Sequence, residues 1–165
     1  MLLYHSHEFD SILFSKECRM CNLPDNKSKW VLINDFREDQ CAQYTSYKFG
    51  TMMWATVGIG FKSKLMFPKG RINEKVYREY LIESNVFEDA DKKFGKFRYI
   101  FQQDGATSHT TPATYKFIEQ KARMLYGWPP NSPDLSPIEM LWSILKNRLT
   151  EINPQPTNQD ELEQC

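Results

Sequence analysis

The sequence predicts a mixed α/β fold, because stretches typical of buried strands come first and helices and strands then alternate. Strands are expected at 11–16, 29–33 and 50–59. A helix, a strand, a helix, a strand and a helix follow them. Hydrophobic residues make up 41% of the chain and aromatic residues 14%, which supports a folded domain with a real core. Parallel pairing of the first and fourth strands would gather their carboxyl ends, where ligands bind in such sheets.

The first three strands are expected from their apolar runs and from the turns between them. Residues 12–14 are consecutive and large, so they cannot all face one side, which is typical of a buried central strand. The strand at 29–33 follows a turn signal at 24–26. The sequence Gly58-Ile59-Gly60 lacks the third glycine and the following helix of a dinucleotide-binding loop, so we interpret it as a turn.

The second half of the chain alternates between helices and strands. Asn73 can cap a helix that runs to about residue 87. A strand is expected at 96–101, where apolar side chains alternate. A helix opens at Thr111-Pro112, because proline is favoured at the first helical position, and a short strand at 124–126 follows it.

The last long helix is expected to begin after Ser136. Its apolar stripe is Ile138, Leu141, Trp142, Leu145 and Leu149. The pattern Thr157-x-x-Asp160 predicts the start of one more helix, and the chain ends before that helix completes two turns.

The charge is balanced, with 21 basic and 21 acidic residues, whereas a dedicated nucleic-acid module is usually more basic. Contacts with DNA would therefore come from local patches. Basic residues at 62, 64, 69, 71 and 75, and at 92, 93, 96 and 98, are candidates for phosphate contacts. A solvated charged face explains them equally well.

Composition also bears on the cellular compartment. The start of the chain does not resemble a signal peptide, and the longest apolar stretch, 52–61, is too short to span a bilayer. Four irregularly spaced cysteines fit free thiols in the nucleus or cytoplasm. A zinc site from Cys18-x-x-Cys21 and His5-x-His7 is an alternative, but residues three apart on a strand face opposite sides.

Two acids are the strongest candidates for a catalytic site. Asp104 follows the fourth strand and Glu139 opens the last long helix, with thirty-four residues between them. Such carboxylates could hold divalent ions for phosphoryl transfer. As alternatives, Asp104 could be a turn residue before Gly105, and Glu139 could complete a capping box. His109 is expected to lead into the next helix rather than to act as a catalytic base.

The segments around these acids resemble motifs of mariner-superfamily transposases. Residues 101–110, Phe-Gln-Gln-Asp-Gly-Ala-Thr-Ser-His-Thr, look like the second-acid motif. Residues 128–142 look like the third-acid motif of the branch whose third acid is glutamate. The similarity covers nearly the whole chain, including Tyr47-Lys48-Phe49-Gly50 and Trp54.

The resemblance implies a ribonuclease H-like fold, a mixed sheet of about five strands with helices on both faces. It implies a catalytic domain at 1–150 with a truncated tail at 151–165. It also implies magnesium or manganese, bound by Asp104 and Glu139, and DNA cleavage and integration at transposon ends. Transposon-end DNA and a second copy of the chain are the implied partners.

The first-acid motif departs from the family at one position. Residues 13–20 resemble the segment that carries the first aspartate, but Lys16 stands at the aspartate position. Glu17 should point to the opposite face of the strand, and Asp10 lies about 20 Å upstream at the usual strand rise. Neither residue is therefore a convincing substitute for the missing acid.

The lysine changes what the site is expected to do. Two carboxylates and one ammonium give a net charge of −2 + 1 = −1, and a buried ammonium must find a partner. We expect Lys16 to bridge Asp104 and Glu139 and to occupy the space of the metal. DNA strand cleavage should then be absent or weak.

Three hypotheses remain open from the sequence. The first is a working transposase, or one that another subunit complements. The second is a non-catalytic remnant or a domesticated DNA-binding or protein-binding domain. The third, a structural protein unrelated to DNA, is disfavoured by the motifs. Because the chain begins almost at the first strand, the helix-turn-helix modules of the family are expected to be missing.

Overall fold

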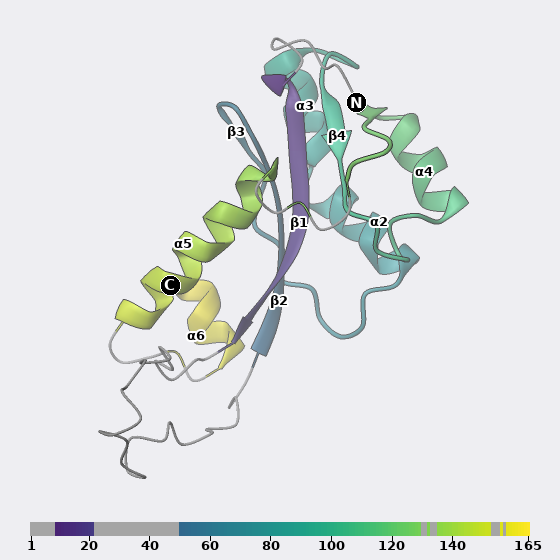
Figure 1. The fold of residues 1–165 in the computed structure, drawn as a ribbon. Helices are drawn as coiled ribbons and strands as arrows, with labels where there is room; N and C mark the ends of the chain where they lie inside the picture. Colours follow the sequence, from purple (N-terminus) through teal and green to yellow (C-terminus); the bar gives the residue numbers. More distant parts are fainter. Residues whose placement is uncertain (1–8, 22–49, 130–131, 133–134, 153–155, 157) are drawn as a thin grey trace, which may run out of the picture.

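A central β-sheet with helices on both sides organises the protein (Figure 1). The computed structural model describes residues 9–21, 50–129, 132, 135–152, 156 and 158–165. The strand predicted at 29–33 lies outside these residues, as do His5 and His7 of the zinc alternative. Cys18 belongs to the apolar core beside the sheet.

The sheet has the strand order β3-β2-β1-β4-β5. The strands are β1 (Ile12–Cys21), β2 (Gly50–Gly58), β3 (Phe61–Lys62), β4 (Ile100–Gln102) and β5 (Arg123–Met124). β1 pairs antiparallel with β2 and parallel with β4, and β4 pairs parallel with β5. The mixed sheet and the parallel pairing of the first and fourth strands are thus confirmed.

The turn between β2 and β3 confirms the interpretation of Gly58-Ile59-Gly60. Gly60 has a φ of 63°, a conformation that glycine adopts without steric cost. A Cβ atom on Gly58 would lie 2.8 Å from the carbonyl oxygen of Ile12. The glycine therefore lets the end of β2 pack closely against β1.

β4 is shorter than the strand predicted at 96–101. Phe97 has a φ of 58° and is 40% exposed, so it does not share a buried face with Tyr99 and Phe101. The amide of Arg98 donates to the carbonyl of Gly95 at 3.1 Å, which closes a turn before the strand. The apolar alternation was therefore misleading in the first half of this segment.

The helix predicted at 73–87 ends earlier, and a second helix follows it. α2 (Glu74–Glu83) begins after Asn73, whose side chain accepts hydrogen bonds from two backbone amides, as predicted. Asn85 then adopts a left-handed conformation, with a φ of 53°, and ends the first helix. α3 (Val86–Phe94) follows it and was not predicted.

The later elements agree more closely with the sequence. α4 (Pro112–Glu119) follows a Thr111 cap, whereas β5 begins one residue before the predicted strand at 124–126. α5 (Pro137–Glu151) follows Ser136. α6 (Gln159–Gln164) is capped by the side chain of Asn158, while Thr157 lies outside the described residues.

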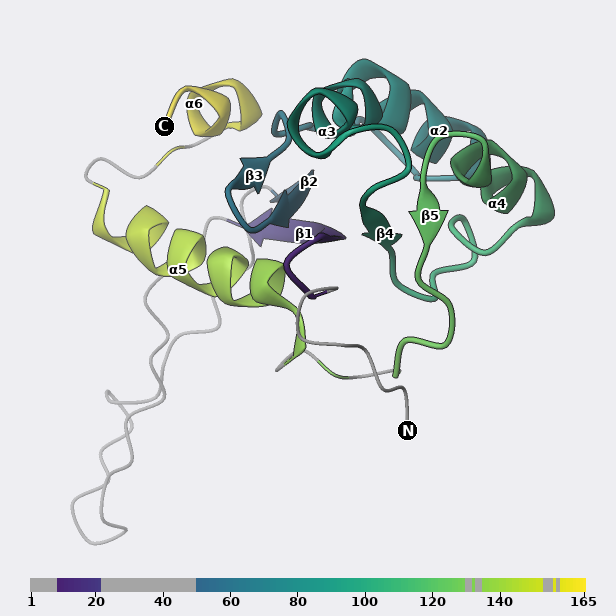
Figure 2. The same ribbon diagram turned by 90° about the horizontal axis from the view of Figure 1, so that it is seen from above.

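Each face of the sheet has its own apolar core. Helices α2, α3 and α4 cover one face, and α5 covers the other (Figure 2). Leu13 of β1 packs in the first core, whereas Ile12 and Phe14 pack in the second. In the stripe of α5, Ile138 and Trp142 are buried, but Leu141 is 43% exposed, so its predicted burial is wrong.

None of the helices in the described part of the chain is long and apolar enough to cross a membrane.

Candidate active site

An open cleft of about 800 Å³ lies at the carboxyl ends of β4 and β5. Lys16, Asp104 and Glu139 all line it, together with the loop after β4 and residues 124–129. The three residues that the sequence analysis singled out are therefore brought to one place by the fold.

The register of the sheet explains why Lys16 and Asp104 meet. β1 and β4 are parallel, and Phe14 is aligned with Gln102. Lys16 and Asp104 each lie two residues farther along, so both side chains point to the same face at the same height. The hydroxyl of Ser15 donates to the carbonyl of Gln102 at 2.9 Å and ties the two strands together.

Lys16 bridges the two acids, as the sequence predicts. Its Nζ lies 3.0 Å from Oδ2 of Asp104 and 3.4 Å from Oε1 of Glu139. Burial lowers the pKa of Lys16, but its contacts with Asp104 and Glu139 outweigh this effect and raise it above the usual value. The ammonium therefore stays charged and holds both carboxylates.

Glu139 does not take part in the capping box that the sequence allowed as an alternative. Ser136 precedes α5, but its side chain makes no capping hydrogen bond. The backbone amide of Glu139 donates to the Ser136 carbonyl at 3.0 Å, while the Glu139 carboxylate lies against Lys16. The first turn of α5 thus presents this acid to the cleft rather than to its own backbone.

His109 has a larger role than the sequence analysis gave it. It is 2% exposed, and its ring lies between two carboxylates. Nδ1 is 2.6 Å from Oδ1 of Asp104, and Nε2 is 2.8 Å from Oε1 of Glu17. The ring of Tyr77 stacks on the imidazole, with the centroids 3.8 Å apart. His109 does precede α4, as expected, and it also contacts two carboxylates, which the sequence did not indicate.

The charges of this trio stabilise one another. Burial lowers the pKa of His109, but the hydrogen bonds and charges of Asp104 and Glu17 outweigh it and raise the pKa to about 9. Burial raises the pKa of Asp104, but His109 and Lys16 together hold it well below its usual range. At neutral pH the site thus contains an imidazolium and an ionised Asp104.

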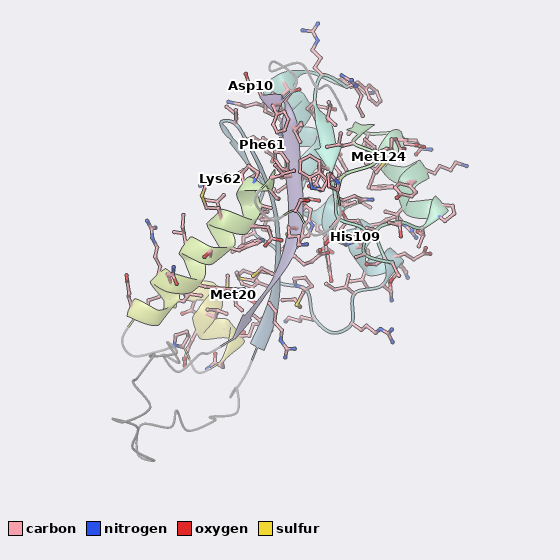
Figure 3. All side chains as sticks on the ribbon, viewed as in Figure 1. Asp10, Met20, Phe61, Lys62, His109 and Met124 are labelled. Atoms are coloured by element: carbon pink, nitrogen blue, oxygen red, sulfur yellow. The ribbon has the colours of Figure 1, made fainter. Side chains whose placement is uncertain are left out.

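Glu17 points away from Lys16, as expected for the next residue on a strand. Its side chain reaches the α2 and α4 face of the sheet, where His109 lies (Figure 3). Asp10 is exposed at the opposite end of β1 from Met20 and is not part of the cleft (Figure 3). The sequence offered one signal for this contact. Glu17 directly follows the strand that is predicted to be buried, and His109 lies just before a predicted helix, so both are ionisable residues close to predicted elements of the site.

Glu17, Asp104 and His109 are close enough to be considered as metal ligands. Their geometry, however, is that of a hydrogen-bonded chain. The two carboxylates lie at opposite nitrogens of the ring, so a single ion bound to one nitrogen would leave the other carboxylate on the far side. We therefore interpret this trio as an ion-paired cluster.

Comparison with known protein families decides the ancestry of this site. Residues 21–163 match the family model described as DDE superfamily endonuclease. The chain belongs to this family. Together with the transposases to which the chain is similar, this match confirms the predicted resemblance to mariner-superfamily transposases.

The Tc3 transposase of Caenorhabditis elegans is 33% identical over 164 residues, which cover 87% of this chain and 48% of that protein. The Tc1 transposase of the same organism is 32% identical over 113 residues, which cover 67% of this chain and 40% of that protein. This DDE-family chain thus spans about half the length of the curated relatives it matches.

Solved structures confirm the ribonuclease H-like fold of this DDE-family chain. The Mos1 transposase in a paired-end complex with the left transposon end aligns with a TM-score of 0.72 and 20% identity, over 96% of this chain and 47% of that one. The catalytic domain of Mos1 mariner transposase aligns with a TM-score of 0.68 and 17% identity, over 96% and 69%.

Proposed function

We propose that this chain is a mariner-type transposase domain that binds DNA but cleaves it weakly or not at all. One observation carries the proposal: the ammonium of Lys16 lies between the carboxylates of Asp104 and Glu139. Membership of the DDE family supports DNA as the substrate class. Transposon ends are the proposed DNA partner, because a related transposase was solved with one.

Magnesium or manganese, which the family implies, does not fit the residues present. Mg²⁺ needs oxygen ligands at about 2.0–2.1 Å, and a two-metal site holds two ions about 3.5–4 Å apart. Here an ammonium contacts both acids, and both oxygens of Asp104 already have cationic partners. Lys16 stands where the family has a carboxylate. Metal binding is therefore disfavoured both by the loss of a ligand and by the added positive charge.

A nicking assay on supercoiled DNA with Mn²⁺ tests the proposal. We compare the natural chain with Lys16→Asp, and we use Lys116→Asp as the matched control, because Lys116 is exposed, outside the cleft and not among the candidate phosphate contacts. Nicking by Lys16→Asp alone is the expected result. Nicking by the natural chain would contradict the proposal and favour a working transposase.

Mn²⁺ binding tests the metal site without requiring DNA cleavage. It is measured by the loss of the free-ion electron paramagnetic resonance signal. Saturable binding by Lys16→Asp but not by the natural chain supports the block by Lys16, even if neither cleaves DNA. Equal binding by both would show that Lys16 does not exclude the metal.

DNA binding is tested separately, because it does not depend on metal. Segment 62–75 contains five exposed basic residues, Lys62, Lys64, Lys69, Arg71 and Lys75. If two of them contact phosphates, replacing both with glutamine should reduce the slope of log K against log salt by about 2. An unchanged slope would favour the alternative of a domesticated protein-binding domain.

A further inference from the structure

The two oxygens of Asp104 have different partners on different faces of the sheet. Oδ2 contacts Lys16 on the α5 face, while Oδ1 contacts His109 on the α2 and α4 face. The backbone amide of Ala106 also donates to Oδ1 at 3.1 Å. Asp104 is therefore held from the second face by contacts that do not involve Lys16.

A buried chain of hydrogen bonds lies behind His109. Glu17 contacts its Nε2, and the Glu17 side chain is 12% exposed. The amide of Gln103 donates to the carbonyl of His109 at 2.8 Å, and Tyr77 donates to the same Gln103 side chain at 3.0 Å. Tyr77 also stacks on the face of the imidazole, while Asp104 and Glu17 contact its two ring nitrogens. These contacts together fix the position and the orientation of the ring.

We propose that Glu17 and His109 are positioning residues, which hold the Asp104 carboxylate in the cleft independently of Lys16. Glu17 orients the imidazolium, and His109 in turn orients Oδ1 of Asp104. The site would then need only the change of Lys16 to an acid to present three carboxylates to the cleft. This second consequence depends on the proposed function, whereas the positioning role itself does not.

The positioning role of Glu17 and His109 is tested in variants in which Lys16 is replaced with alanine. In proton NMR spectra, the ring N–H groups of His109 that face carboxylates should give downfield signals in the natural chain. The Nδ1 proton signal should persist in Lys16→Ala, because Glu17 and His109 still hold Asp104. In the double variant Lys16→Ala with Glu17→Gln, the same signal should broaden or vanish.

Two results would overturn the positioning role. One is loss of the Nδ1 proton signal in Lys16→Ala alone, which would make Lys16 the true anchor of Asp104. The other is an unchanged signal in the double variant. Lys16→Ala with Glu79→Gln is the matched control, because Glu79 is an exposed residue of α2 outside this cluster and the substitution is the same. Unfolding midpoints identify any variant that is not folded.

Mn²⁺ binding tests the second consequence. Residues that orient a metal ligand typically change metal affinity by about 10–100-fold. Adding Glu17→Gln to Lys16→Asp should therefore weaken Mn²⁺ binding by at least about 10-fold, while adding Glu79→Gln should leave it unchanged. Equal affinity of all three variants would overturn this second consequence. If Lys16→Asp binds no Mn²⁺, the proposed function fails, and the NMR comparison still decides the role of Glu17 and His109.

Discussion

The two groups of residues that contact or neighbour Asp104, one on each face of the sheet, differ in how deeply they are buried. On the α5 side, Lys16 and Glu139 have side chains that are 31% and 32% exposed, and they face an open cleft. On the other side, His109 is buried and stacked, and Glu17 pairs with it. Water screens the first pair of charges but not the second. The open side can thus change its residue types at little cost to stability, whereas the buried side cannot.

The largest expected effect is on the buried side. His109→Ala removes the common partner of Glu17 and Asp104 and leaves a cavity beside Tyr77. Breaking one partner of a buried ion pair costs about 3–5 kcal/mol. Urea unfolding should show a loss in this range, compared with less than about 0.5 kcal/mol for the exposed Thr107→Ala, which lies outside the cleft. Equal losses would show that the buried contacts are not stabilising.

Stability should also fall as the pH rises. The pKa of His109 is raised from 6.5 to about 9, so its stabilisation is complete below pH 6.5 and is lost as the pH rises through about 9. The loss should be roughly 3 kcal/mol at most. Urea midpoints measured across this range should decrease for the natural chain. They should decrease much less for His109→Gln, and parallel curves would contradict the assignment.

A smaller effect is expected at Tyr77, whose hydroxyl contacts Gln103, which in turn donates to the carbonyl of His109. Tyr77→Phe keeps the stacked ring but removes the donor to Oε1 of Gln103, which is 3.0 Å away. Leaving a buried acceptor without this donor costs about 1–3 kcal/mol. Urea unfolding measures the cost. A neutral substitution would mean that the stacking alone supports His109.

The smallest effect is expected on the open side. Lys16→Met keeps the length of the side chain but removes the charge between Asp104 and Glu139. Because all three side chains are partly exposed, the change in unfolding free energy should be below about 1 kcal/mol and should shrink in high salt. A loss as large as that of His109→Ala would remove the distinction between the two sides.

Local patterns predicted much of the fold. The run of apolar residues at 12–14 indicated a central strand, and Asn73 and Thr111 mark helix starts as expected. Failures occurred where the backbone departs from the regular pattern. Asn85 and Phe97 both have positive φ, which split one predicted helix and shortened one predicted strand. Apolar spacing carries no information about such conformations.

The sequence by itself determined the family, the strand that carries Lys16 and the two acids that this lysine would meet. It also allowed the bridge to be predicted, because the parity of a strand and an ammonium's need for partners are local rules. Tertiary structure alone decided the role of His109 and Glu17. These residues are 92 positions apart, and they meet because Asp104 lies at the end of a strand paired with β1. The two carboxylates beside His109 then keep its imidazole protonated at neutral pH.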